Sequence, residues 1–158
     1  MIIEFGHFAL ILAFMVALLQ SILPLIGASL NRHGLMALAM PAATAQFVLV
    51  LTAFGALTHA FVTSDFSVQL VVLNSHSLKP MIYKISGVWG NHEGSLLLWI
   101  LILAVFGACA AWFGQNLTLT FRARVIAVQG MIGASFLAFC IFPSNPFLRV
   151  APAPLDGQ

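Results

Sequence analysis

Four long apolar runs dominate this chain and limit what it can fold into. They cover residues 6–29, 36–62, 95–114 and 124–143. Each is long enough to cross a bilayer as a helix, which takes about 20 apolar residues. A helix also satisfies its own backbone hydrogen bonds in lipid, where no water can do so. We therefore expect an all-α, polytopic integral membrane protein with about four transmembrane helices.

The overall composition excludes a water-soluble protein. Of the 158 residues, 61% are hydrophobic and only 6% are charged, whereas soluble domains carry about 25% charged residues. The net charge of +2 is small and scattered, so we expect no nucleic-acid partner. Cys109 and Cys140 lie inside apolar runs and form no CxxC pair, which indicates small buried hydrophobes rather than a disulfide.

The N-terminus does not resemble a cleaved signal peptide. It has no basic leader, it carries Glu4 and His7, and its apolar run from Phe8 to Leu30 exceeds the length of a signal sequence core. We expect this run to be retained as the first transmembrane span.

Polar and small residues inside the runs predict helix-to-helix packing. Gln20, Gln46 and Gln129 lie within spans, and an amide in lipid must find a hydrogen-bond partner on a neighbouring helix. Small residues at steps of three and four predict close contact for the third and fourth spans. These are Ala104, Gly107, Ala108 and Ala111, followed by Gly130, Met131, Gly133 and Ala134.

The basic residues suggest an orientation. Arg32 lies between spans one and two, and Arg122 and Arg124 lie at the start of span four, so we expect both loops to be cytoplasmic. The outer-face segment 63–94 and the proline-rich tail 144–158 would then lie on the outer side of the membrane. We expect a bacterial inner membrane, with these residues on its periplasmic side, and the alternative is the inner membrane of an organelle. Three basic residues on that side weigh against this orientation: Lys79, Lys84 and Arg149.

The outer-face segment holds most of the residues able to carry chemistry. Its apolar stretch 66–73 is too short to span, which indicates a position at the interface or a re-entrant turn. Directly before the third span comes the run Asn91-His92-Glu93-Gly94-Ser95. This run is either a helix cap, with Asn91 accepting from first-turn amides and Glu93 facing the positive helix end, or a functional surface.

A second polar cluster on the same side contains His76, Lys79 and Lys84. His76 and His92 are each able to ligate a haem iron, although hydrogen bonding is the commoner role of a lone histidine. The lysines suit haem propionates or anionic lipid headgroups. Two further pairs, Glu4 with His7 and His59 with Asp65, are interpreted as ordinary polar contacts.

Several spaced motifs carry a family resemblance. They are Asp65-Phe66-Ser67-Val68, Asn74-Ser75-His76-Ser77, Lys79-Pro80, Tyr83-Lys84, Gly87-Val88-Trp89-Gly90-Asn91-His92-Glu93-Gly94-Ser95 and Ser144-Asn145-Pro146-Phe147. Through them the chain resembles the N-terminal part of the CcmF-type (CcmF/NrfE) cytochrome c maturation proteins. The resemblance covers essentially the whole chain.

The resemblance implies a membrane subunit of a haem lyase. Such a subunit receives haem from a haem chaperone, helps to attach it to an apocytochrome c, and is thought to hold a b-type haem within the membrane. The partners implied are that chaperone, apocytochrome c or its thiol-handling subunits, other lyase subunits and the lipid bilayer. The family's tryptophan-rich segment and its usual haem-ligand histidines lie beyond the matched region. The sequence is therefore interpreted as a fragment or as one product of a split gene.

Two functional interpretations remain open for these residues. In the first, residues 74–95 form a platform for haem or its carrier, with His92, Trp89, His76, Lys79 and Lys84 as the contacting side chains. The motif residues Gly90, Asn91, Glu93, Gly94 and Ser95 would shape that platform. In the second, the four spans are a structural scaffold of the lyase and contact no haem. A transporter is disfavoured because the spans lack charged groups at mid-membrane depth.

Overall fold

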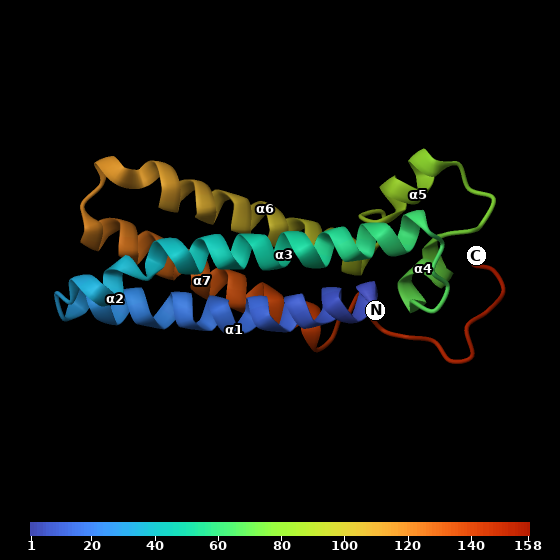
Figure 1. The fold of residues 1–158 in the computed structure, drawn as a ribbon, viewed down its shortest axis with the longest axis horizontal. Helices are drawn as coiled ribbons and strands as arrows, with labels where there is room; N and C mark the ends of the chain where they lie inside the picture. The colour runs from blue at the N-terminus through green and yellow to red at the C-terminus, as the bar shows by residue number, and fades with distance from the viewer.

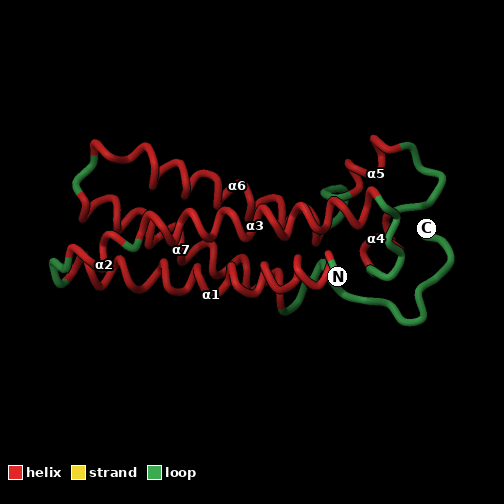
Figure 2. The backbone as a smooth tube through the Cα atoms, in the orientation of Figure 1, coloured by secondary structure: helices red, strands yellow, loops and turns green.

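Four long helices lie side by side in the computed structural model, which describes all 158 residues (Figure 1). They are α1 (Ile2–Ser29), α3 (Ala39–Val62), α6 (His92–Phe113) and α7 (Leu119–Ile141). Each belongs to a helical segment long and apolar enough to cross a membrane. There is no β-sheet (Figure 2), only an isolated bridge between Val68 and Arg149. The expected all-α membrane fold with four transmembrane helices is confirmed.

Short helices and loops gather at the two ends of the bundle. At one end lie α2 (His33–Ala37) and the 3-10 turn η1 (Gly114–Asn116). At the other end lie α4 (Gln69–Asn74), α5 (Met81–Gly87) and both chain termini (Figure 1). Arg32, between α1 and α2, and Arg122, in the first turn of α7, therefore lie at one end, and the outer-face segment and tail share the opposite end.

Local chemistry explains where the long helices begin. α6 starts at His92 rather than near residue 95 because the Asn91 side-chain oxygen accepts from the Gly94 N–H at 2.7 Å, capping the first turn. α7 starts at Leu119, behind the Thr118 hydroxyl that accepts from the Phe121 N–H. Pro41 is accommodated in the first turn of α3, where its missing N–H needs no partner.

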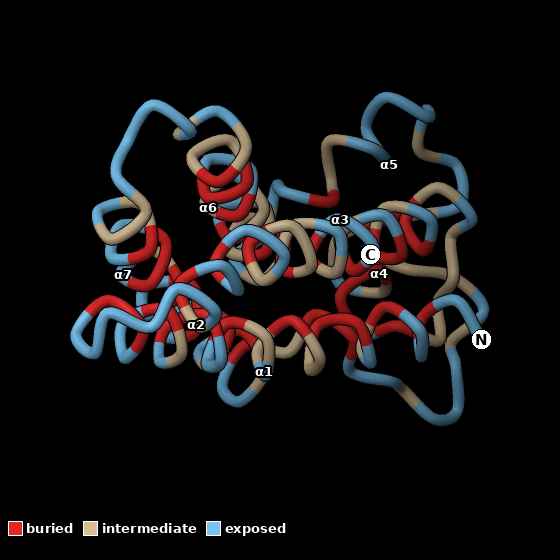
Figure 3. Tube along the Cα trace, turned by 60° about the vertical axis from the view of Figure 1, so that its left-hand side comes forward, coloured by how far each residue is buried: buried red, intermediate tan, exposed pale blue.

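Many of the residues buried between the helices are small, and many large apolar side chains are exposed around the bundle. Figure 3 shows which positions of the backbone are buried. The predicted small-residue stripe of α6 is buried throughout, at Ala104, Gly107, Ala108 and Ala111. On α7 the buried residues are Gly130, Gly133 and Ala134, whereas Met131 is 42% exposed and does not belong to the contact. The close approach of backbones that these residues allow is the usual basis of helix packing in lipid.

A chain of three glutamine side chains joins all four long helices. Gln20 of α1 donates to the Gln129 side-chain oxygen of α7 and to the Ile126 carbonyl at 3.1 Å. Gln129 in turn donates to the Leu103 carbonyl of α6 at 3.2 Å and to the Gln46 oxygen of α3 at 3.4 Å. The expectation that these amides bond between helices is confirmed.

Candidate functional site

The end of the bundle that carries α4 and α5 is closed by what we call the polar cap, which is the outer-face segment 63–94 together with Pro143 and the tail 144–158. The tail runs beside the start of α4, where the Gln69 N–H donates to the Leu148 carbonyl and the Val150 N–H to the Ser67 carbonyl, both at 2.9 Å. The apolar stretch 66–73 contributes Val68, Leu70 and Val71 to the main hydrophobic core. This stretch therefore packs onto the helix ends.

Arg149 ties the tail to the beginning of the chain. Its guanidinium donates to the Glu4 carboxylate and to the Ser67 hydroxyl, and lies 4.0 Å from the Asp65 carboxylate. The N–H groups of an arginine guanidinium point in fixed directions, so one side chain can donate to two partners at once. The bond to Glu4 is also strengthened by the opposite charges of the two groups. This role of Arg149 has no local sequence signal, because the carboxylate that it binds lies 145 residues away in the chain.

Neither of the two polar pairs expected from the sequence forms. His7 instead lies 3.3 Å from the Asn145 side-chain nitrogen and stacks on the Phe147 ring, with ring centroids 6.0 Å apart. Asp65 accepts from the Ser67 N–H and hydroxyl rather than meeting His59. The expected contacts were wrong because the tail and the 65–67 turn supply nearer partners.

Asp156 fixes the far part of the tail to the loop before α5. Its carboxylate accepts from the Ser77 N–H at 2.9 Å and from the Ser77 hydroxyl, and it lies 3.4 Å from the His76 ring nitrogen Nε2. These hydrogen bonds from Ser77, helped by the Gly157 N–H and the nearby His76, lower the pKa of Asp156 to about 2.

Three of the five candidate contact residues are occupied by bonds within the cap. The His76 nitrogen Nδ1 accepts from the Leu78 N–H at 3.2 Å, and its other nitrogen faces Asp156. Lys79 donates to the Asn74 carbonyl at 2.9 Å, and Lys84 donates to the Ser64 hydroxyl at 2.7 Å. These side chains stabilise the loops that surround α4 and α5.

The motif before α6 builds a tight turn. Besides capping α6, the Asn91 side chain donates to the Gly87 carbonyl at 2.8 Å. A Cβ atom at Gly94 would lie 1.6 Å from the Val88 carbonyl oxygen, so only glycine fits there. Ser95 donates to the His92 carbonyl at 3.0 Å. Asn91 therefore acts as the N-terminal cap of α6.

Trp89 and His92 are the candidate residues whose side chains remain free. Trp89 is 43% exposed, and His92 is exposed with no hydrogen-bond partner within the chain. The His92 ring meets Phe139 of α7 edge to face, with centroids 6.3 Å apart. His92 thus contacts α7 while His76 contacts the tail, so the two imidazoles do not converge on one site.

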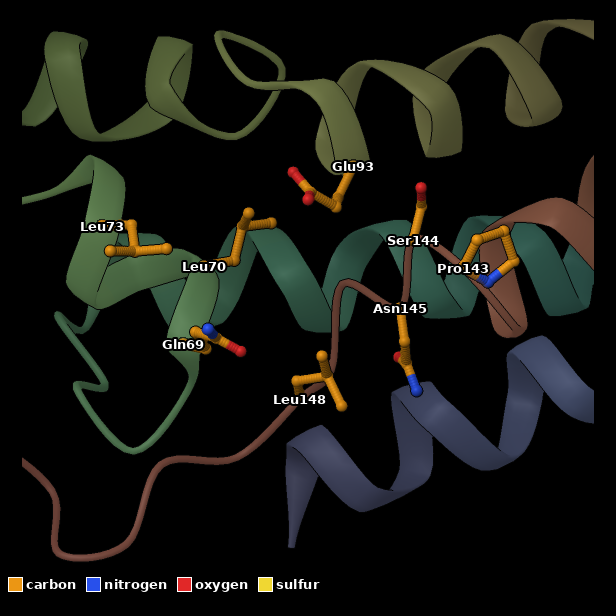
Figure 4. Close-up of a pocket in the computed structure, with 8 residues that line it drawn as sticks. All are labelled: Gln69, Leu70, Leu73, Glu93, Pro143, Ser144, Asn145 and Leu148. Atoms are coloured by element: carbon orange, nitrogen blue, oxygen red, sulfur yellow. The ribbon is translucent and has the colours of Figure 1, made fainter.

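Beside the start of α6 lies a cavity of about 160 Å³ (Figure 4). It is formed between α4, the first turn of α6 and the turn after α7, and its polar lining comes from Gln69, Glu93, Ser144 and Asn145. The apolar lining is Leu70, Leu73, Pro143 and Leu148. The sequence motif contained Glu93, but the return of the tail that brings Ser144 to it has no local sequence signal.

Comparison with known proteins decides the family. The chain is 63% identical over all 158 residues to the cytochrome c-type biogenesis protein ccl1 of Rhodobacter capsulatus, of which it covers 24%. It is 55% identical to CycK of Rhizobium meliloti and 52% identical to CcmF of Pseudomonas aeruginosa, again over its whole length. The chain belongs to the CcmF family. It corresponds to the N-terminal region of these proteins. A scan against protein-family models gave no match.

A solved structure of the same family supports the assignment. The chain superposes on a structure named cytochrome c heme lyase CcmF with a TM-score of 0.88 and 26% sequence identity, covering 93% of this chain and 25% of that one. The chain therefore spans about a quarter of the length of the CcmF proteins it matches.

Haem is the cofactor that the CcmF family implies, and the residues present fit it only as a surface contact. One free imidazole, His92, lies beside aromatic and apolar side chains of α6 and α7. The other candidate imidazole, His76, is held by Leu78 and Asp156, and no cluster of three or more His, Cys, Asp or Glu residues forms a metal site. The arrangement does not fit a haem pocket with two histidine ligands.

Proposed function

We propose that this chain is the N-terminal part of a haem lyase subunit in cytochrome c maturation, and that its polar cap positions haem or the carrier that delivers it. The observation that carries the proposal is the pair of free side chains, Trp89 and His92, on a cap whose other candidate residues are held in place by internal bonds. A rigid support with a few free aromatic and imidazole groups suits recognition.

The chemistry of haem matches this surface. Haem has a large apolar face and two carboxylates, and the exposed rings of Trp89 and Tyr83 offer apolar contact area at low entropic cost. Under this proposal the cap faces the periplasmic side of an inner membrane. The partners are then a haem chaperone, apocytochrome c or its thiol-handling subunits, and the other parts of the lyase.

A scaffold role is the second candidate, and a specific observation favours it. His76, Lys79 and Lys84 all bond within the cap, as does Asn91. In that case the four spans and the cap brace other lyase parts and touch no haem. The two functions differ in what happens when the free side chains alone are removed.

The deciding experiment replaces Trp89 and His92 together by alanine and measures holocytochrome c in the cell. We expect the yield to fall about fivefold, the effect of losing about 1 kcal/mol of contact, with unchanged amounts of the protein in the membrane. Trp99→Ala, which removes an exposed ring about two turns into α6 and away from the cap, serves as the control. An unchanged yield in the double variant would reject the platform and favour the scaffold.

A further inference from the structure

The cavity beside α6 holds polar groups that have no partner within the chain. The four ion pairs of the molecule involve other residues, so the Glu93 carboxylate is unpaired. Ser144 is only 7% exposed, and its hydroxyl makes no hydrogen bond within the chain. That hydroxyl points toward the α6 side of the cavity, where Glu93 lies (Figure 4). The cavity therefore offers hydrogen-bond acceptors and one negative charge, but no cation.

The helix start next to the cavity offers the opposite chemistry. In the first turn of α6, the Gly94 N–H is taken by the Asn91 side chain and the Ser95 N–H by the Asn91 carbonyl. The N–H groups of His92 and Glu93 have no partner within the chain. Free N–H groups at the positive end of a 22-residue helix favour an anion such as phosphate.

A separate apolar groove lies along the contact between α6 and α7. It is lined by Leu96, Ser135, Phe136 and Phe139, with a volume of about 360 Å³. Leu96 lies about one helical turn after Glu93, and Phe139 about one turn before Pro143 of the cavity lining. The polar cavity and the apolar groove therefore lie within about one helical turn of each other along α6 and α7. We call the two together the α6–α7 seam.

We propose that the α6–α7 seam binds a phospholipid with a primary ammonium headgroup, phosphatidylethanolamine. Its ammonium group would donate to Glu93 and Ser144, its phosphate would accept from the free N–H groups of α6, and an acyl chain would lie in the groove. A primary ammonium has three N–H donors to satisfy. Phosphatidylcholine has none on its quaternary nitrogen, and phosphatidylglycerol has no cation. The adjoining groove favours a lipid over the lysine of a protein partner.

The first test measures lipid retention. The full chain is mixed in detergent with equal amounts of phosphatidylethanolamine, phosphatidylglycerol and phosphatidylcholine, and bound lipid is identified by native mass spectrometry. We expect phosphatidylethanolamine to be retained at least about tenfold over the other two, the difference expected when about 1.4 kcal/mol of binding is lost. In Glu93→Gln this preference should fall to within about twofold, whereas Asp156→Asn, which removes a carboxylate elsewhere in the cap, should keep it.

A second test locates the lipid and needs no variant. A carbodiimide joins a carboxylate to a nearby primary amine as an amide, while the reagent takes up the water and leaves as a urea. In vesicles containing phosphatidylethanolamine, the peptide bearing Glu93 should gain the mass of one lipid less one water. Equal retention of all three lipids with no such adduct would overturn the proposal. Coupling of Glu93 to a lysine of another polypeptide would also overturn it and identify a protein-docking site.

Discussion

At the scale of single residues, the polar cap depends on a few side chains that each hold two segments together. Arg149 joins the tail to Glu4 and Ser67, and Asp156 joins the end of the tail to Ser77. Gly94 contributes in another way, because the absence of a side chain lets the Val88 carbonyl approach the start of α6. The surface of the cap is thus fixed by contacts between residues far apart in the sequence.

The pH dependence of the Asp156 contact follows from its lowered pKa. The folded carboxyl titrates at about 2, below its usual value of 3.8. The contact therefore contributes its full stabilisation above about pH 4, and that contribution is lost as the pH falls through about 2. The amide resonance of Ser77, followed by NMR in detergent micelles, should shift with a midpoint near pH 2.

The matched variant for this titration is Ser77→Ala, which removes the hydroxyl donor but keeps the backbone N–H. Its Asp156 midpoint should move upward toward 3.8, because the side-chain bond from Ser77 is the largest cause of the lowered pKa. A midpoint near 4 already present in the unaltered protein would show that the tail does not pack against Ser77.

At the scale of helices, the glutamine chain fixes how the four spans meet. Gln129 is its central member, since it accepts from Gln20 and donates to Gln46 and to the backbone of α6. Glycines make room for these amides: a Cβ atom at Gly107 would lie 2.6 Å from Gln129, and one at Gly133 would lie 2.5 Å from Gln46. Amide and glycine positions therefore have to match across helices.

Replacing Gln129 by leucine should lower the free energy of unfolding in micelles by about 1–2 kcal/mol. The change removes the bonds of Gln129 to Gln20, to Gln46 and to the Leu103 carbonyl, and it leaves the Gln46 oxygen without a donor inside the bundle. Unfolding in SDS, followed by circular dichroism, measures this loss. Changing Gln20 and Gln46 to leucine as well should recover most of it. Gln115→Leu, in the exposed turn before α7, should have little effect, and a loss as large as that of Gln129→Leu would contradict the account.

The sequence predicts the helices well and their polar contacts poorly. Apolar runs of sufficient length predict the four spans, and mid-span glutamines predict bonding between helices. Both predictions hold because lipid offers no hydrogen bonds, so backbone and side-chain polar groups must find partners within the protein. The partner of Arg149 or of His7 has no such local signal, since it depends on where the tail returns. For the same reason the cavity that unites Glu93 with Ser144 emerges only in the fold.

At the scale of the whole molecule, a four-helix membrane bundle supports a polar cap at one end and exposes large apolar residues around its sides. Most of the polar groups of the cap are bonded to one another, which leaves Trp89 and His92 free on its surface. In CcmF proteins this region is about a quarter of the length. Under the proposed function, this module presents a small surface to haem or its carrier.

The measurement that tests this account most directly places a photo-activated cross-linking amino acid at position 89 while the cell is maturing cytochrome c. We expect it to capture haem or the haem chaperone. The same amino acid at position 113, whose phenylalanine is 78% exposed at the opposite end of the bundle, should capture neither. Capture of other lyase subunits alone from position 89, with no haem and no chaperone, would contradict the platform and leave the module as a scaffold.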